Sequence, residues 1–115
     1  MGAIAESGTE HGSSVLTVDL GALAANWRLL AERAAPAGTA AAVKGDGYGL
    51  GLAPVGRTLW AAGCRTFFVA TMDEGLALRA TLPDAEICVL NGLIAGDPAL
   101  FRRHRLVPAL NDLGQ

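Results

Sequence analysis

Residues 42–51, AVKGDGYGLG, contain the only lysine of the chain, Lys44, and its only tyrosine, Tyr48. Eight arginines supply the other basic side chains. An amine can lose its proton and condense with a carbonyl group, whereas a guanidinium stays charged, so a lone lysine in an arginine-rich chain indicates a Schiff-base role. A solvent-exposed lysine at a strand end is the alternative interpretation, and position and uniqueness alone leave both open.

Glycines alternate with other residues after the lysine, at positions 45, 47, 49 and 51. Glycine allows positive φ and close approach to a ligand, and free N–H groups at the start of a following helix suit a phosphate. The spacing matches neither a Walker A loop nor G-x-G-x-x-G. Tyr48 offers a hydroxyl donor, although a partly buried aromatic ring is its simpler interpretation. We expect Asp46 to brace the loop by accepting backbone N–H bonds.

Strand and helix patterns alternate around this segment. A short β-prone run predicts a strand at 15–18, and largely apolar runs without alternation predict strands at 39–43, 66–70, 86–90 and 106–110. Three- and four-residue apolar spacing predicts helices from residue 20, with Asp19 as N-cap, and at 52–62, 73–82 and 97–103. Such an α/β pattern is typical of a parallel sheet buried on both faces. A doubly wound sheet and the opening of a (β/α)8 barrel both fit it, and both place Lys44 at the carboxyl end of a strand, where such folds bind ligands.

The N-terminal end of the chain looks like a tail, and the C-terminal end suggests a domain that is cut short. Residues 1–14 lack the basic and apolar regions of a secretory signal. We expect them to form a flexible N-terminal tail. Residues 15–115 predict one partial domain, and 111–115 look like the start of a further helix. Because a complete barrel needs about 250 residues, we expect a truncated sheet.

The composition excludes several classes of protein. The chain is 51% hydrophobic and 17% charged, with a formal net charge of −2. This balance argues against a nucleic-acid partner, which needs a basic face, and no stretch approaches the roughly 18 apolar residues of a membrane span. Cys64 and Cys88 lack zinc or disulfide spacing, so we expect no metal site and a reducing, cytoplasmic setting.

The run AVKGDGYGLG resembles the pyridoxal-phosphate attachment segment of alanine racemases, whose usual form is A-V-V-K-A-[DN]-A-Y-G-H-G. Further matches extend the resemblance over residues 15–115: Val18–Leu23 with Asn26, Phe68–Thr71, Asp73–Gly75, Leu78-Arg79 and Ile87–Gly92. The match covers about the first third of a full racemase. The resemblance implies the N-terminal portion of a TIM-type (β/α)8 barrel that holds pyridoxal 5'-phosphate. In the full-length homodimer, such a protein interconverts L- and D-alanine.

The resemblance also implies roles for two residues. Lys44 would bind pyridoxal phosphate covalently and serve as one of two acid/base groups at the substrate α-carbon. Tyr48 would donate its hydroxyl to the cofactor phosphate. The second base of the family, a tyrosine, comes from a later domain of the partner subunit, so we expect this chain alone to be inactive. A non-catalytic pyridoxal-phosphate-binding module, an inert truncated remnant, and serine or another small amino acid as substrate are the alternatives.

The glycine run departs from the family pattern at three positions. Gly45 and Gly47 stand where alanines are usual, and Leu50 stands where a histidine is usual. Because glycine loses more conformational freedom on folding than alanine, we expect a looser loop.

Overall fold

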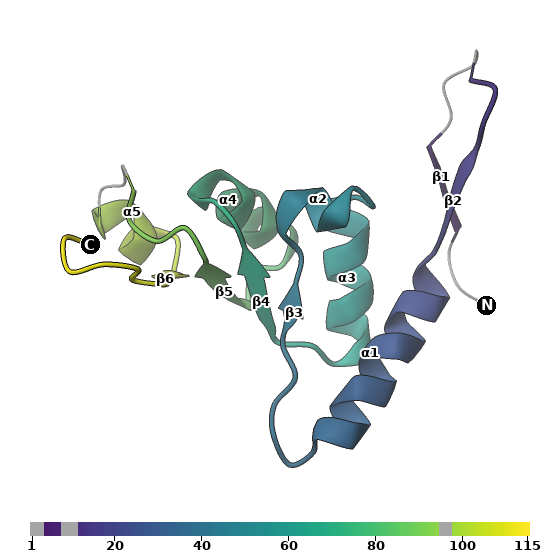
Figure 1. Ribbon diagram of the computed structural model, residues 1–115, viewed down its shortest axis with the longest axis horizontal. Helices are drawn as coiled ribbons and strands as arrows, with labels where there is room; N and C mark the ends of the chain where they lie inside the picture. The colour runs from purple at the N-terminus through teal and green to yellow at the C-terminus, as the bar shows by residue number, and fades with distance from the viewer. Residues whose placement is uncertain (1–3, 8–11, 95–97) are drawn as a thin grey trace.

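The computed structural model describes residues 4–7, 12–94 and 98–115, which form two sheets and five helices (Figure 1). The antiparallel pair is β1 (Ile4–Ser7) and β2 (Leu16–Asp19), and the parallel sheet contains β3 (Ala41–Ala42), β4 (Thr66–Val69), β5 (Glu86–Val89) and β6 (Leu106–Pro108). The helices are α1 (Leu20–Ala34), α2 (Lys44–Tyr48), α3 (Leu52–Ala62), α4 (Met72–Thr81) and α5 (Pro98–Arg103).

The order of the parallel strands selects one of the two expected architectures. The four strands lie side by side in chain order, β3-β4-β5-β6, and each pair is parallel. A doubly wound sheet reverses its order at a switch point, whereas chain order throughout is the order of a (β/α)8 barrel. The described sheet is therefore the N-terminal portion of a barrel.

Burial along β4 and β5 shows that the crossover helices cover one face of the sheet. Phe67, Val69, Ile87 and Val89 are fully buried and join one cluster with the inner faces of α3, α4 and α5. The intervening side chains of these strands, among them Phe68 and Cys88, are less buried. The expectation of burial on both faces is wrong for the described residues, because the helices all pack on the same side. In a complete barrel the opposite face points inward and meets the other strands.

The expected helices agree with the structure to within one or two residues. The strands of the parallel sheet are shorter than expected, and β2 is shifted by one residue from the expected 15–18. Asp19 caps α1, with its Oδ1 accepting the Ala22 N–H at 2.9 Å. β3 has two paired residues, although the Val43 N–H continues the pairing by donating to the Phe68 carbonyl at 2.8 Å. Residues 111–115 form a turn instead of the expected helix.

A strand lies within the segment for which a flexible tail was expected. β1 pairs with β2 in antiparallel register, from Ile4 opposite Asp19 to Ser7 opposite Leu16, and this hairpin stands away from the parallel sheet in Figure 1. The pairing uses backbone groups, which a side-chain pattern does not report. Residues 1–3 and 8–11 of the expected tail lie outside the described residues, and its flexibility stays a prediction.

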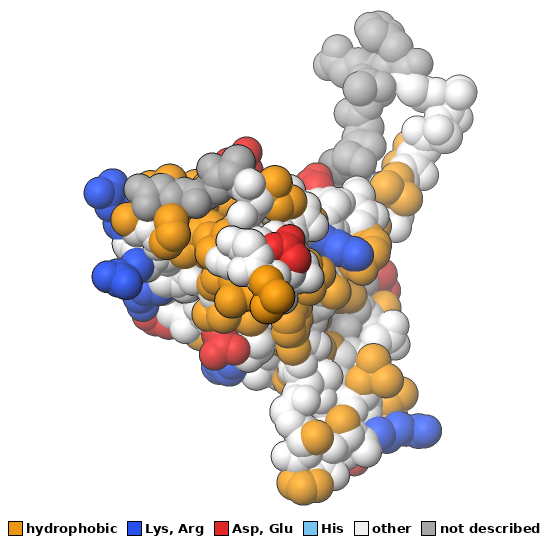
Figure 2. All heavy atoms as spheres, turned by 60° about the vertical axis from the view of Figure 1, so that its left-hand side comes forward, with side chains coloured by type: hydrophobic (Ala, Val, Ile, Leu, Met, Phe, Trp, Pro, Cys, Tyr) orange, Lys and Arg blue, Asp and Glu red, His pale blue; other side chains and the backbone are white. Residues whose placement is uncertain are grey.

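The edge strand β6 and the residues after it expose apolar side chains. β6 is the last strand, and Val107, Leu110 and Leu113 in and after it are exposed. Figure 2, in which this side of the molecule comes forward, shows many apolar side chains on the visible surface. An edge strand with unpaired backbone groups can accept a further strand.

Arg79 of α4 holds together the two segments that lead into β5 and β6, at the amino ends of these strands. Its guanidinium donates to five backbone carbonyls, at distances from 2.5 to 3.3 Å: those of Leu82, Pro83, Ala85, His104 and Arg105. Burial lowers the pKa of Arg79, and nearby Arg105 lowers it further, yet a guanidinium remains charged at neutral pH. One side chain thus joins the end of α4 to the turn before β6.

We predict that Arg79→Ala lowers the free energy of unfolding by about 2 kcal/mol or more, because bonds from a charged donor are worth about 1.5–3 kcal/mol and several carbonyls lose theirs together. Urea unfolding of the 115-residue chain measures the change. Exposed Arg102→Ala is the control. Equal stability of the two variants would contradict this role for Arg79.

Candidate active site

Lys44 lies two residues after the end of the parallel strand β3. The preceding Val43 is buried and hydrogen-bonded to β4, whereas Lys44 is exposed. The alternation of a strand explains this change, because successive side chains point to opposite sides. The amine therefore lies at the carboxyl edge of the sheet, as expected from the sequence.

The residues after Lys44 form a left-handed helical turn. The φ/ψ angles are 62°/44° at Gly45, 55°/47° at Asp46 and 65°/39° at Gly47, and φ stays positive at Tyr48 and Gly49. The turn is closed by hydrogen bonds from Gly47 N to the Val43 carbonyl (2.9 Å) and from Gly49 N to the Gly45 carbonyl (2.8 Å). Residues with a Cβ pay about 1–2 kcal/mol each in this conformation.

The left-handed turn reverses the expected effect of Gly45 and Gly47. At φ of 62° and 65° a glycine avoids the strain that an alanine carries, so it favours this backbone instead of loosening it. Gly47 is also buried, and a Cβ placed there would lie 3.3 Å from Cγ2 of Val55. The glycine run is therefore matched to the turn that the chain adopts.

The turn presents Lys44 and Tyr48 on an open surface. Both side chains are exposed, Tyr48 by 64%. A Cβ added at Gly45 or Gly49 would meet nothing within 4 Å, which shows that space is free beside the turn. An amine, a phenol hydroxyl and open space next to backbone are features that a small phosphorylated ligand can use.

Asp46 braces the turn, as expected. Its Oδ1 accepts the Leu52 N–H at 2.8 Å, and its carbonyl accepts the Gly51 N–H at 2.8 Å. Gly51 is the N-cap of α3 and has no side chain to cap with, so the Asp46 carboxylate supplies the missing acceptor. The turn is thus fixed to the start of α3.

Glu74 joins the turn to the next strand, a contact that sequence reasoning missed. Its Oε2 accepts the Asp46 N–H at 3.2 Å and its Oε1 accepts the Ala70 N–H at 3.1 Å. Its own N–H donates to Oγ1 of Thr71, the N-cap of α4, at 3.2 Å. The spacing Thr71-x-x-Glu74 is a capping-box signal visible in the sequence, but nothing local connects position 74 with position 46.

The two cysteines are poorly suited to nucleophilic chemistry. Burial raises the pKa of the Cys64 thiol, and burial together with Glu86 raises the pKa of Cys88. Both are free thiols that stay protonated at neutral pH, and the thiol is the unreactive form. Across residues 4–7, 12–94 and 98–115, no group of three or more His, Cys, Asp or Glu side chains could hold a metal ion. No helix in the same ranges is long and apolar enough to cross a membrane.

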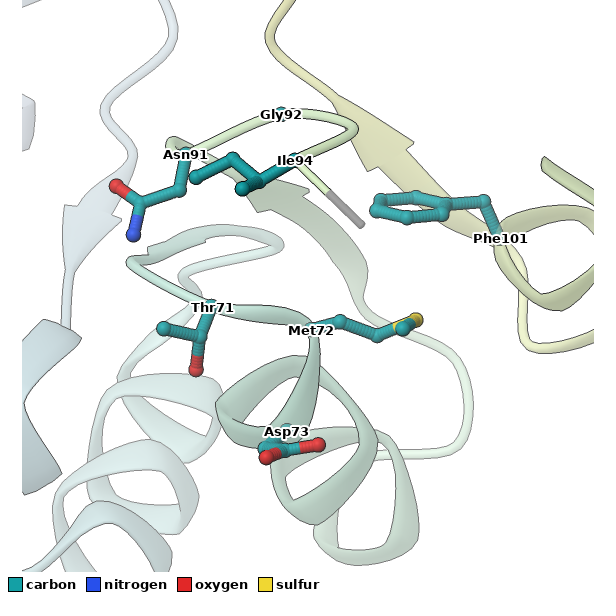
Figure 3. A pocket seen from close by; sticks show the side chains of 7 residues that line it. All are labelled: Thr71, Met72, Asp73, Asn91, Gly92, Ile94 and Phe101. Carbon is teal, nitrogen blue, oxygen red and sulfur yellow. The ribbon is translucent and has the colours of Figure 1, made fainter. Parts of the chain in front are cut away.

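A cavity of about 220 Å³ lies at the carboxyl ends of β4 and β5 (Figure 3). Its walls come from three segments: the start of α4 with Thr71, Met72 and Asp73, the loop after β5 with Asn91, Gly92 and Ile94, and Phe101 of α5. Neither Lys44 nor Tyr48 lines it. The cavity is therefore separate from the lysine turn, although both lie at the carboxyl ends of the parallel strands.

The fold and the site define an α/β-barrel domain with a lysine at the head of a glycine-rich turn after a strand. Residues 18–115 match the family model described as "Alanine racemase, N-terminal domain". The chain belongs to the alanine racemase family, which confirms the resemblance seen in the sequence.

Individual relatives agree with this assignment. The chain is 54% identical over 100 residues to an alanine racemase of Methylobacterium sp. (strain 4-46), a match that spans 87% of this chain and 27% of the relative. The structure of alanine racemase from Bartonella henselae with covalently bound pyridoxal phosphate superposes with a TM-score of 0.78 at 41% identity, over 82% of this chain and 28% of that one. The alanine racemase of Streptomyces coelicolor A3(2) gives 0.75 at 38% identity, over 82% and 26%. The chain thus spans about a quarter of the length of the relatives it matches.

We predict that Gly45→Ala destabilises the chain by about 1 kcal/mol through positive-φ strain alone. Gly47→Ala should cost about 2 kcal/mol, because Val55 must also move. Gly38→Ala is the control, since Gly38 is exposed and its Cβ would meet nothing within 4 Å. Thermal unfolding measures all three, and equal melting temperatures for the Gly47 and Gly38 variants would refute the left-handed turn.

Proposed function

We propose that this chain is the N-terminal part of an alanine racemase in which Lys44 carries pyridoxal 5'-phosphate. The observation that carries the proposal is the exposed amine of the chain's only lysine, two residues after β3, at the head of a left-handed turn that also presents Tyr48. The identity of 54% to an alanine racemase supports the same function. So does the covalent pyridoxal phosphate of the Bartonella henselae relative.

The residues of the turn fit this cofactor. Lysine can lose its proton and bind an aldehyde, and Tyr48 can donate its hydroxyl to a phosphate oxygen. Free space beside Gly45 and Gly49 leaves room for a ring and a phosphate close to the backbone. When bound, the cofactor supplies an electron sink that makes the α-proton of an amino acid acidic.

Lys44 then provides acid/base chemistry on one face of the substrate. Its neutral amine accepts the α-proton, and its ammonium form returns a proton to the same face. Inversion also requires a group on the opposite face, which we assign to a part of the protein outside residues 1–115. We therefore propose a homodimeric, cytoplasmic enzyme that interconverts L- and D-alanine, and no racemisation by these 115 residues alone.

We predict that pyridoxal phosphate followed by borohydride labels Lys44. The amine and the aldehyde condense with release of one water, and hydride then makes the new carbon–nitrogen bond permanent. Tandem mass spectrometry of the digested chain locates the added mass, with Lys44→Ala as control. The N-terminus is the competing amine, because the chain has one lysine. Labelling of the N-terminus alone would leave an inert remnant as the better description.

We predict that Tyr48→Phe raises the pyridoxal phosphate concentration needed for half-maximal labelling by about tenfold, since a hydrogen bond to a charged group is worth about 1.5 kcal/mol. The ring is retained, so packing is unchanged. Free pyridoxal, which has no phosphate, should label the variant and the unaltered chain equally. An equal loss with both ligands would place the Tyr48 hydroxyl away from the phosphate.

A further inference from the structure

We infer that Glu74 is the positioning residue of the cofactor lysine, holding the left-handed turn so that Lys44 and Tyr48 face the same ligand. The inference rests on the proposed function, and it gives a role to a residue of α4, the third element after α2 in the chain. The Glu74 carboxylate binds backbone N–H groups and not the side chains of Lys44 or Tyr48. It acts through the backbone of Asp46, which is two residues from each of them.

Asp46 needs this support because its backbone is strained. It has a Cβ and a φ of 55°, a conformation that costs about 1–2 kcal/mol for such a residue. Three hydrogen bonds hold it there: Glu74 binds its N–H, Gly51 its carbonyl and Leu52 its carboxylate. Strained residues persist when their surroundings over-determine them. Two of these bonds are local to the loop and α3, and only the one to Glu74 connects the turn to β4 and α4.

Glu74 is itself well anchored. It lies in the first turn of α4, where the helix dipole favours a negative charge, and its N–H is bound by Thr71. Each of its carboxylate oxygens accepts one backbone N–H, of Asp46 and of Ala70. Bonds from N–H to a carboxylate are about twice as strong as neutral ones. Glu74 thus holds the turn at a fixed position relative to Ala70, which follows the carboxyl end of β4.

The variant Glu74→Gln removes this tether with little change of shape. A glutamine has one acceptor oxygen and an NH₂ group, so it satisfies one of the two N–H groups and opposes the other. Because the single oxygen must serve either Ala70 or Asp46, we expect Asp46 to keep its acceptor for only part of the time and the turn to sample other conformations. Lys44 then remains reactive, but its orientation relative to Tyr48 is no longer fixed.

Asp73→Asn is the matched control. Asp73 is the neighbouring acid in the same helical turn and is exposed, so its neutralisation removes the same charge but leaves the bonds to Asp46 and Ala70 in place. Both variants and the unaltered chain are labelled with pyridoxal phosphate and borohydride over a concentration series. Before borohydride is added, the visible circular dichroism of the bound cofactor is recorded at equal occupancy of the three proteins.

We expect Glu74→Gln to need about tenfold more pyridoxal phosphate for half-maximal labelling and to give a weaker dichroic band per bound cofactor. The control should match the unaltered chain in both. A purely structural role would reduce the folded fraction without changing the band per bound cofactor. Unchanged labelling and dichroism in Glu74→Gln would overturn the inference.

A measurement without cofactor keeps the inference testable where the variant does not fold. Hydrogen exchange of the unaltered chain, followed by NMR, should show the Asp46 amide protected although Asp46 is exposed. An Asp46 amide that exchanges as fast as a free loop amide would overturn the tether. Failure of the unaltered chain to label Lys44 would instead refute the proposed function, and the Asp46 amide would still report on Glu74.

Discussion

Five consecutive residues with positive φ, residues 45–49, follow Lys44, and the geometry of the site depends on keeping them in that conformation. A left-handed turn is unfavourable for residues with a Cβ, so glycines at three of the five positions remove most of the strain. Asp46 and Tyr48 keep theirs. The turn places Lys44 and Tyr48, both exposed, in one short segment at the carboxyl end of β3.

The remainder of the described structure holds this turn in place. Pairing of Val43 with Phe68 fixes where β3 ends, the Asp46 carboxylate fixes where α3 begins, and Glu74 ties the turn to the end of β4. Beneath these contacts, the buried face of the sheet packs on α3 and α4 with glycines at close approaches. A Cβ at Gly56, for example, would lie 2.8 Å from Cδ1 of Leu78. The strained loop therefore rests on a rigid core, as precise positioning requires.

The face of the sheet opposite the helices is less well covered. Phe68 and Cys88 are half-buried there, and the β6 edge exposes Val107. Relatives about four times as long provide further chain that can complete such a barrel. Under the proposed function, such further chain both completes the barrel and supplies the second acid/base group.

The sequence by itself determined what local interactions control. It located Lys44 at a strand end, the cap Asp19, and α3 within its observed bounds, because apolar periodicity and capping act over a few residues. The motif AVKGDGYGLG also indicated the family. Only the tertiary structure decided the strand order, the one-sided packing of the helices, the pairing of β1, and the bond from Glu74 to Asp46. Each of these joins segments whose contact depends on how the whole sheet assembles, and the free energy of such long-range contacts leaves no local pattern in the chain.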